Sequence, residues 1–250
     1  MYTFHVSLDK VDYAKKLSDE LYFQFQNDKG IADYSVIKIL NKLKKIKLPT
    51  ASEMSPIERW DNVANSMPGD IAGKYKNELS FFLSGITSGD ILEAMCGFNS
   101  YILPDKDKIV MAQDYSRRML LRYEYPERIR FQFDLNDLPD KKIELPDESF
   151  DNIVFIKGYK YINSPVHMFE EWHRLLKRNG KLIFVESTLA GYRDIMVREL
   201  DIEICKKELV AAGFSNQTAK ALNFKANIVE DLDFLSAFEE KLILFNAQKT

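Results

Sequence analysis

The stretch that decides the fold runs from residue 171 to residue 183 and reads EWHRLLKRNGKLI. Its first half has the apolar spacing of a helix, Gly180 supplies a turn, and residues 181–185 form a short apolar run typical of a buried strand. Similar apolar runs occur earlier, at residues 91–95, 109–113, 130–133 and 152–156. Short apolar strands that alternate with helical segments predict a parallel sheet covered by helices on both faces.

The surrounding sequence predicts two parts. Residues 71–250 are expected to form one doubly wound, mostly parallel α/β domain of seven strands, with helices near 71–83 and 194–212 and a last strand at 242–245. Amphipathic spacing in residues 12–47 predicts two helices, so residues 1–70 are expected to be a helical extension. Such an extension can act as a lid that excludes water from a site.

Composition excludes several classes of protein. The 35 Lys and Arg residues nearly balance 38 Asp and Glu residues, so the formal net charge of −3 gives no field for nucleic acid or an anionic membrane. Cys96 and Cys205 lack the close Cys or His companions of a zinc site. Neither a signal peptide nor a membrane-spanning run is evident. We expect a cytoplasmic protein without metal, nucleic acid or membrane partners, and the sequence leaves the oligomeric state open.

Ligands of such sheets bind outside the carboxyl ends of the strands. The first of these ends is followed by residues 93–99, EAMCGFN, and the second by Asp114. An acidic residue about 20 residues beyond the first loop accepts hydrogen bonds from ribose hydroxyls in dinucleotide-binding folds. An aspartate after a strand also commonly begins a turn or caps a helix, so Asp114 alone is a weak signal.

Further blocks follow in order: DLNDLP at 134–139, LPDESFD at 145–151, GYKYINSP at 158–165, and the stretch at 171–183. Together, over residues 91–187, the sequence resembles class I S-adenosylmethionine-dependent methyltransferases of the small-molecule type. The resemblance implies a Rossmann-like fold, S-adenosylmethionine as cofactor, and a transferase that methylates a small molecule. It therefore implies a role in small-molecule metabolism.

The resemblance also implies roles for individual residues. Glu93 would stand at the acidic start of the first motif, and Gly97 would let the backbone approach the methionine part of the cofactor. Asp114 would bind the ribose. The remaining residues expected to contact the cofactor are Asn99 in the first loop, Tyr115, Met119, Asp134 and Leu135 around the adenine, and Lys157 beneath the sulfonium.

Catalytic candidates lie in the run Gly158-Tyr159-Lys160-Tyr161, where the acceptor would enter. Tyr159 and Tyr161 are the candidates, since aromatic rings stabilise a sulfonium through cation–π contact. Tyr75 and Trp60 are further aromatic candidates for that contact. The alternative interpretation is structural, with Lys160 solvated and the tyrosines packed under the N-terminal extension.

The first loop departs from the family pattern. Met95, Phe98 and Asn99 replace small residues, only Gly97 remains, and Pro104 truncates the next helix. One interpretation is drift with retained cofactor binding, because Asn tolerates the left-handed region. The other is a reshaped pocket that bends the cofactor's amino acid arm, so that the arm cyclises to azetidine-2-carboxylate or is cleaved, with release of methylthioadenosine.

Two more hypotheses concern the class of protein. The missing glycines are compatible with a partner subunit that has lost the cofactor. A nicotinamide dehydrogenase is disfavoured, because its loop requires Gly-x-Gly-x-x-Gly and this chain offers only one glycine at Gly97.

Overall fold

The computed structural model describes residues 58, 60, 61, 76–188, 197–222 and 241–250. The chain divides into two compact units, Met1–Met67 and Pro68–Thr250. In the first unit, Glu58, Trp60 and Asp61 have helical backbone. The two helices expected in residues 12–47 and the cofactor candidate Tyr75 lie outside the described residues, and the domain boundary expected at residue 70 stays a prediction.

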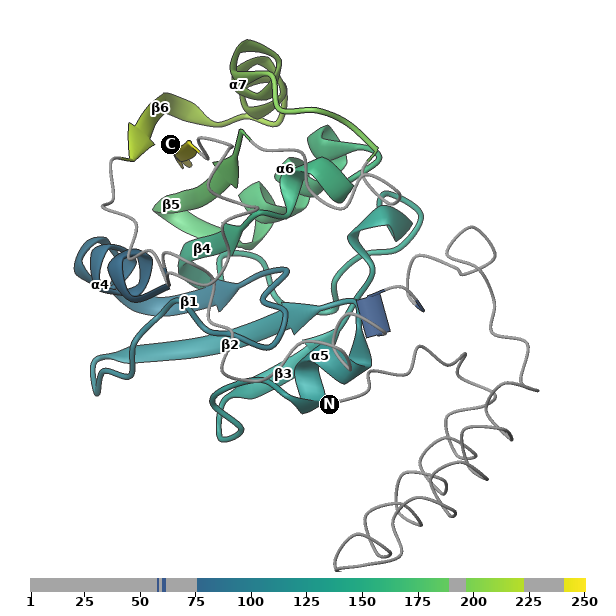
Figure 1. Cartoon of the computed structure of the whole chain (residues 1–250). Coiled ribbons are helices and arrows are strands. Elements are labelled where there is room, and N and C mark those ends of the chain that lie inside the picture. The colour runs from purple at the N-terminus through teal and green to yellow at the C-terminus, as the bar shows by residue number, and fades with distance from the viewer. Residues whose placement is uncertain (1–57, 59, 62–75, 189–196, 223–240) are drawn as a thin grey trace, which may run out of the picture. The chain divides into compact units, whose positions relative to one another are not determined.

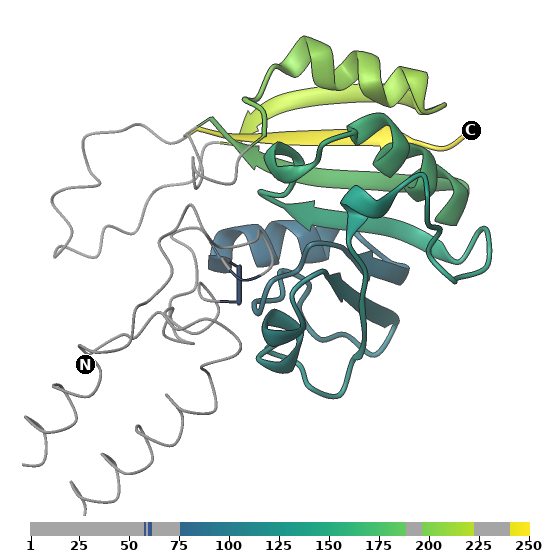
Figure 2. The same ribbon diagram turned by 90° about the vertical axis from the view of Figure 1, so that its right-hand side faces the viewer.

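The second unit contains a seven-stranded sheet in the order β3-β2-β1-β4-β5-β7-β6 (Figure 1). The strands are β1 Gly89–Glu93, β2 Lys108–Asp114, β3 Ile129–Gln132, β4 Phe150–Ile156, β5 Leu176–Ser187, β6 Ser215–Leu222 and β7 Leu242–Gln248. Neighbours from β3 to β5 pair in parallel, whereas β7 pairs antiparallel with both β5 and β6. Figure 2 shows the yellow strand β7 between these two strands. The predicted mostly parallel, Rossmann-like sheet is confirmed.

Helices cover both faces of the sheet. Successive residues of a strand point to opposite faces, so a strand that is apolar throughout must be covered on both. Ile91 of β1 packs in one apolar cluster with α4, Lys76–Ile86. Leu92, the next residue, belongs to the cluster on the other face with α6, Pro165–Leu175, and α7, Ile202–Ala211. A short helix α5, Arg117–Leu121, follows β2, and two 3₁₀ turns, η3 Leu135–Asp137 and η4 Tyr159–Tyr161, follow β3 and β4.

Three local predictions are wrong. The helix expected from residue 194 begins at residue 202 instead, because the Asp201 carboxylate caps it by accepting from the amides of Glu203 and Ile204. The strand expected to reach Met95 ends at Glu93, since Met95 adopts a positive φ of 47°. The turn expected at Gly180 does not form, because Gly180 lies within β5. In addition, no strand was predicted at residues 215–222, yet β6 forms there; its alternating polar and small residues carry little apolar signal.

The connection from β1 to β2 has no helix at all. Residues 94–107 form only turns, bends and irregular backbone. The helix that was expected to be shortened by Pro104 is therefore absent. The backbone amides that its first turn would have presented must be held by other groups.

Candidate functional site

The order of the strands reverses between β1 and β4, since β2 and β3 lie on one side and β5 on the other. Ligands of open α/β sheets bind at such a switch point, outside the carboxyl ends of the strands. The candidate site therefore consists of the segments that follow β1, β2, β3 and β4.

The segments after β1 and β2 meet directly. The amide of Gly97 donates to Oδ2 of Asp114 at 2.9 Å, while the Ser116 amide donates to Oδ1 at 2.8 Å. Gly97 has φ of 60°, and a Cβ atom there would have no protein atom within 4 Å. The backbone at Gly97 thus borders open space beside a carboxylate, which is the arrangement needed for a ribose and for close approach of a ligand to the chain.

Gln113, for which the sequence predicted no role, connects three of these segments. Its Oε1 accepts from the Met95 amide at 3.1 Å, and its Nε2 donates to the carbonyl of Phe133 at 2.6 Å. The side chain is fully buried. A glutamine inside the apolar run 109–113 was the available signal, because a buried amide needs partners.

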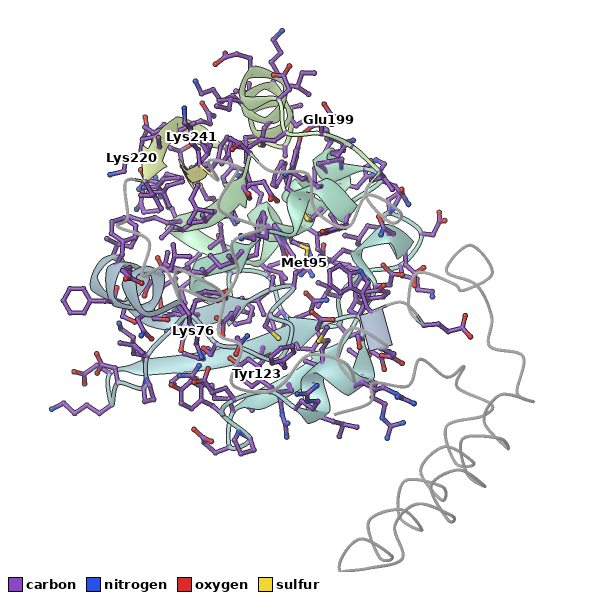
Figure 3. All side chains as sticks on the ribbon, viewed as in Figure 1. Lys76, Met95, Tyr123, Glu199, Lys220 and Lys241 are labelled. Carbon is purple, nitrogen blue, oxygen red and sulfur yellow. The ribbon has the colours of Figure 1, made fainter. Side chains whose placement is uncertain are left out.

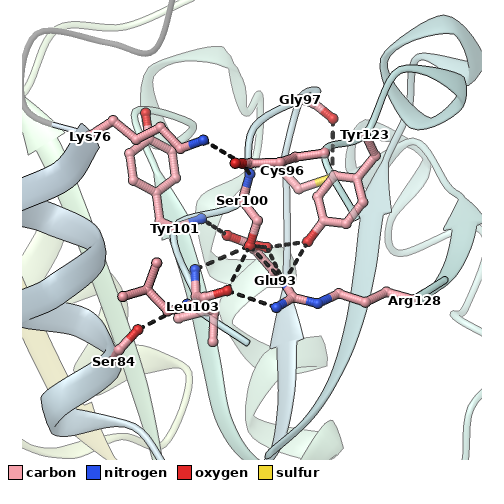
Figure 4. Close-up of polar contacts among 12 residues, drawn as sticks. Lys76, Ser84, Glu93, Cys96, Gly97, Ser100, Tyr101, Leu103, Tyr123 and Arg128 are labelled. Atoms are coloured by element: carbon pink, nitrogen blue, oxygen red, sulfur yellow. Dashed lines mark hydrogen bonds and ion pairs between the residues drawn. The ribbon is translucent and has the colours of Figure 1, made fainter. Parts of the chain in front are cut away.

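Glu93 is only 2% exposed and anchors the rest of the first loop (Figure 4). Its carboxylate accepts from Ser100 Oγ at 2.7 Å, from the Tyr101 amide at 2.5 Å, and from the Tyr123 hydroxyl. Burial raises the pKa of Glu93, and these hydrogen bonds oppose the rise. The carboxylate faces its own loop, so it organises residues 100 and 101 where a helix is missing.

Arg128 completes this cluster from the segment before β3. Its Nη1 lies 3.9 Å from Glu93 Oε2 and donates to Ser100 Oγ at 2.7 Å and to the Tyr123 hydroxyl at 3.2 Å. Its Nη2 donates to the Ile102 carbonyl at 2.8 Å. The guanidinium thus compensates the charge of the buried Glu93 carboxylate, and it also holds residues 100 and 102 of the first loop through hydrogen bonds. Neither Arg128 nor Tyr123 carried a motif signal in the sequence.

Asp134 lies in the segment after β3. It caps η3, where its Oδ1 accepts from the Asn136 amide at 2.9 Å. The other residues expected around the adenine have mixed surroundings. Leu135 and Met119 are buried in the core, and the Tyr115 carbonyl accepts from Gln132 Nε2 at 2.8 Å.

Asn99 and Phe98, two residues of the first loop that stand where the family has small residues, differ in their burial. Asn99 is half-buried. Phe98 is buried with the guanidinium of Arg122 at 4.9 Å from its ring centroid, and its carbonyl accepts from the Glu124 amide at 2.9 Å. Phe98 is therefore packed toward the segment after α5.

The segment after β4 begins with Lys157, which is exposed and has a φ of 58°. Tyr159 is 1% exposed, and its ring stacks on Phe169 and Phe184 at centroid distances of 6.2 and 6.5 Å. Its hydroxyl donates to Glu208 Oε2 at 2.6 Å and accepts from Arg198 Nη1 at 3.2 Å. Burial raises the pKa of Tyr159. These contacts favour a structural role for this tyrosine.

Tyr161 and Lys160 differ in burial. Tyr161 is half-buried, and its carbonyl accepts from Asn136 Nδ2 at 3.2 Å. The interpretation of Lys160 as solvated is wrong, because it is 3% exposed, donates to the Ser187 carbonyl and lies 3.8 Å from Glu186. A buried ammonium needs such partners.

Within the described part of the chain, no group of three or more His, Cys, Asp and Glu side chains is placed to hold a metal ion. The helices in that same part are too short or too polar to cross a bilayer.

The fold is that of a class I, Rossmann-like methyltransferase domain. Residues 92–184 match the family model described as "Methyltransferase domain". This stretch is accordingly a domain of the class I S-adenosylmethionine-dependent methyltransferase family.

Solved structures share the fold at low sequence identity. A phosphoethanolamine N-methyltransferase 2 from Haemonchus contortus, in complex with S-adenosyl-L-methionine, is 13% identical with a TM-score of 0.52. The match covers 69% of this chain and 52% of that chain, so this chain spans about half of that protein. The [4+2]-cyclase SpnF is 14% identical, with a TM-score of 0.57 and coverage of 82% and 98%.

An S-adenosylmethionine-dependent methyltransferase from Mesorhizobium loti is 16% identical, with a TM-score of 0.52 and coverage of 72% of this chain and 100% of that chain. A search by sequence found no curated protein with a significant match.

Proposed function

We propose that this chain transfers the methyl group of S-adenosylmethionine to a small molecule. The observation that carries this proposal is the meeting of Asp114 and Gly97 at the switch point of the sheet, 2.9 Å apart through the Gly97 amide. The residues fit an adenosyl ligand, because Gly97 borders open space and each oxygen of a carboxylate can accept more than one hydrogen bond. When bound, the cofactor supplies an electrophilic methyl group on a sulfonium.

Within this proposal the residues have distinct tasks. Asp114 binds the ribose hydroxyls, and the backbone around Gly97 and Asn99 borders the amino acid end of the cofactor. Glu93 acts indirectly, by holding the loop through Ser100 and Tyr101.

The adenine end is proposed to lie along the segments after β2 and β3. The residues of those segments are Tyr115, Met119, Asp134 and Leu135. For Leu135 the contact is through its backbone amide, since its side chain is buried.

The acceptor is proposed to approach the segment after β4, beside Lys157 and Tyr161. Tyr161 is the better catalytic candidate of the two tyrosines, because Tyr159 directs its hydroxyl to Glu208 in the layer between the sheet and α7. A nucleophilic acceptor such as an amine or thiolate requires little proton removal in the transition state, so the proposal assigns no general base.

A small-molecule acceptor is supported by one structural neighbour. The H. contortus enzyme has also been solved with phosphomonomethylethanolamine and S-adenosylhomocysteine, on the same fold. The near-balance of charge over the whole chain also disfavours a polyanionic acceptor. A cytoplasmic location and an N-terminal lid remain predictions that accompany this proposal.

The proposal is tested by binding and then by product analysis. Calorimetric titration with S-adenosylhomocysteine should give a saturable, one-site isotherm that Asp114→Asn weakens. Wild-type protein incubated with S-adenosylmethionine and a small-molecule extract should form S-adenosylhomocysteine in amounts that depend on the extract. Absence of heat at high protein concentration would favour a binding subunit that has lost the cofactor.

The second candidate is a non-methylating reaction of the cofactor, either cyclisation or cleavage with release of methylthioadenosine. Two observations favour it: the crossover from β1 to β2 lacks a helix, and Met95 stands where the family has a small residue. Incubation with S-adenosylmethionine alone separates the candidates, because only this second reaction forms methylthioadenosine without an acceptor.

A further inference from the structure

Met95 lies at the switch point itself. It is the second residue after β1 and is labelled in Figure 3. Its amide donates to Oε1 of Gln113 at 3.1 Å. Its side chain extends to the first residues after β4. A Cβ atom on Gly158 would lie 2.4 Å from Met95 Sδ and 2.6 Å from its Cε, so Met95 occupies the space directly above Gly158.

The position of Asp114 fixes which part of a nucleoside reaches Met95. With the ribose at the end of β2, the 5′ carbon of the nucleoside points toward the loop after β1, as the phosphates do in dinucleotide-binding folds. A substituent on that carbon therefore extends past Gly97 toward the boundary between β1 and β4. Met95 fills that boundary, whereas Gly97 leaves its own side open.

We propose that Met95 is a specificity-determining residue whose side chain the amino acid arm of S-adenosylmethionine must displace, so that it discriminates between nucleosides by the length of their 5′ substituent. This inference rests on the proposed function. Displacement is feasible because methionine is unbranched and adapts readily to irregular spaces. Met95 is also only partly buried, at the edge of the large core cluster.

The discrimination is measured with two ligands that share the adenosine. S-adenosylhomocysteine carries the full arm, and methylthioadenosine carries only a methylthio group. For Met95→Ala we expect the Kd of S-adenosylhomocysteine to fall about tenfold, which corresponds to about 1.4 kcal/mol. The Kd of methylthioadenosine should change less than twofold, because its short substituent ends before the space that Met95 occupies.

Met111→Ala is the matched control. Met111 is a partly buried methionine against the same core cluster, but it lies within β2 and pairs with Ile129, away from the carboxyl ends. We expect this variant to leave the ratio of the two Kd values unchanged. Met95→Gly gives a second variant, since glycine tolerates the φ of 47°, and it should shift the ratio as Met95→Ala does.

Two results would overturn the inference: equal changes for both ligands, or weaker binding of S-adenosylhomocysteine by both Met95 variants. The second result would mean that Met95 contributes a favourable contact to the arm. If neither ligand binds the wild-type protein or any variant, the proposed function fails, and the inference fails with it. If both ligands bind and the Met95 variants leave the ratio of their Kd values unchanged, the proposed function stands and only the specificity role of Met95 is refuted.

Discussion

Arg128 offers the sharpest test of how the first loop is held. The substitution Arg128→Met removes a guanidinium that donates to Ser100, Tyr123 and Ile102 and lies 3.9 Å from Glu93. The Arg128 and Glu93 side chains are only 9% and 2% exposed, so solvent screens their interaction weakly. Removal of one partner of a buried pair costs about 3–5 kcal/mol, because the other charge is left uncompensated.

We therefore expect Arg128→Met to lower the free energy of unfolding by about 3–5 kcal/mol in urea denaturation. Arg130→Met is the control. Arg130 donates to the carbonyls of Leu120 and Pro126, at 2.7 and 3.2 Å, and no carboxylate is among those partners. Its loss should cost about 1–2 kcal/mol.

The pH dependence identifies Glu93 as the group that is left uncompensated. The pKa of Glu93 is raised in the folded protein, so the folded state binds the proton more tightly than the unfolded state. Its contribution to stability is therefore greatest at low pH and falls as the pH rises from the ordinary range of a glutamate to the folded pKa. Loss of Arg128 raises that pKa further, because a favourable positive charge is removed.

The stability difference between wild type and Arg128→Met should consequently be larger at pH 7 than at pH 5, where protonation of Glu93 relieves the uncompensated charge. Urea denaturation at both values measures this. A difference below about 1 kcal/mol, or one that does not change with pH, would refute the idea that Arg128 neutralises Glu93.

Three further predictions concern single residues. Asp114→Asn should raise the Kd of S-adenosylhomocysteine by about tenfold to a hundredfold, because one hydrogen bond to a charged group is lost. An unchanged titration isotherm would show that Asp114 does not bind the ligand. Tyr159→Phe removes the hydroxyl that donates to Glu208, so it should lower the free energy of unfolding by about 1–3 kcal/mol, while the KM of the acceptor stays constant. A large loss of kcat without loss of stability would instead show that Tyr159 is catalytic. Gly97→Ala meets no atom within 4 Å, so thermal unfolding should report only the backbone cost of φ 60°, about 1–2 kcal/mol, and a larger loss would show that the space beside Gly97 is occupied.

The sequence was sufficient for much of the fold, because its signals are local. Apolar runs such as residues 152–156 and 181–185 become neighbouring strands, although Gly180, which was expected to form a turn, lies within β5. The same reasoning placed Asp114 and Gly97 at one edge of the sheet, because parallel strands direct their carboxyl ends to the same side. It failed for β6, whose alternation is polar and small, and for the start of α7, which depends on a single capping side chain.

Only the tertiary structure decided which side chains face one another. Periodicity places Glu93 at the end of a strand, but its partner Arg128 comes from an irregular segment whose path depends on the register of β2 against β3. Tyr159 turns inward because α7 supplies Glu208 and the segment before α7 supplies Arg198, and both residues lie far along the chain. Met95 reaches Gly158 because β1 and β4 are paired in parallel. Local sequence signals predict most individual strands, whereas contacts across the sheet depend on pairing between distant segments.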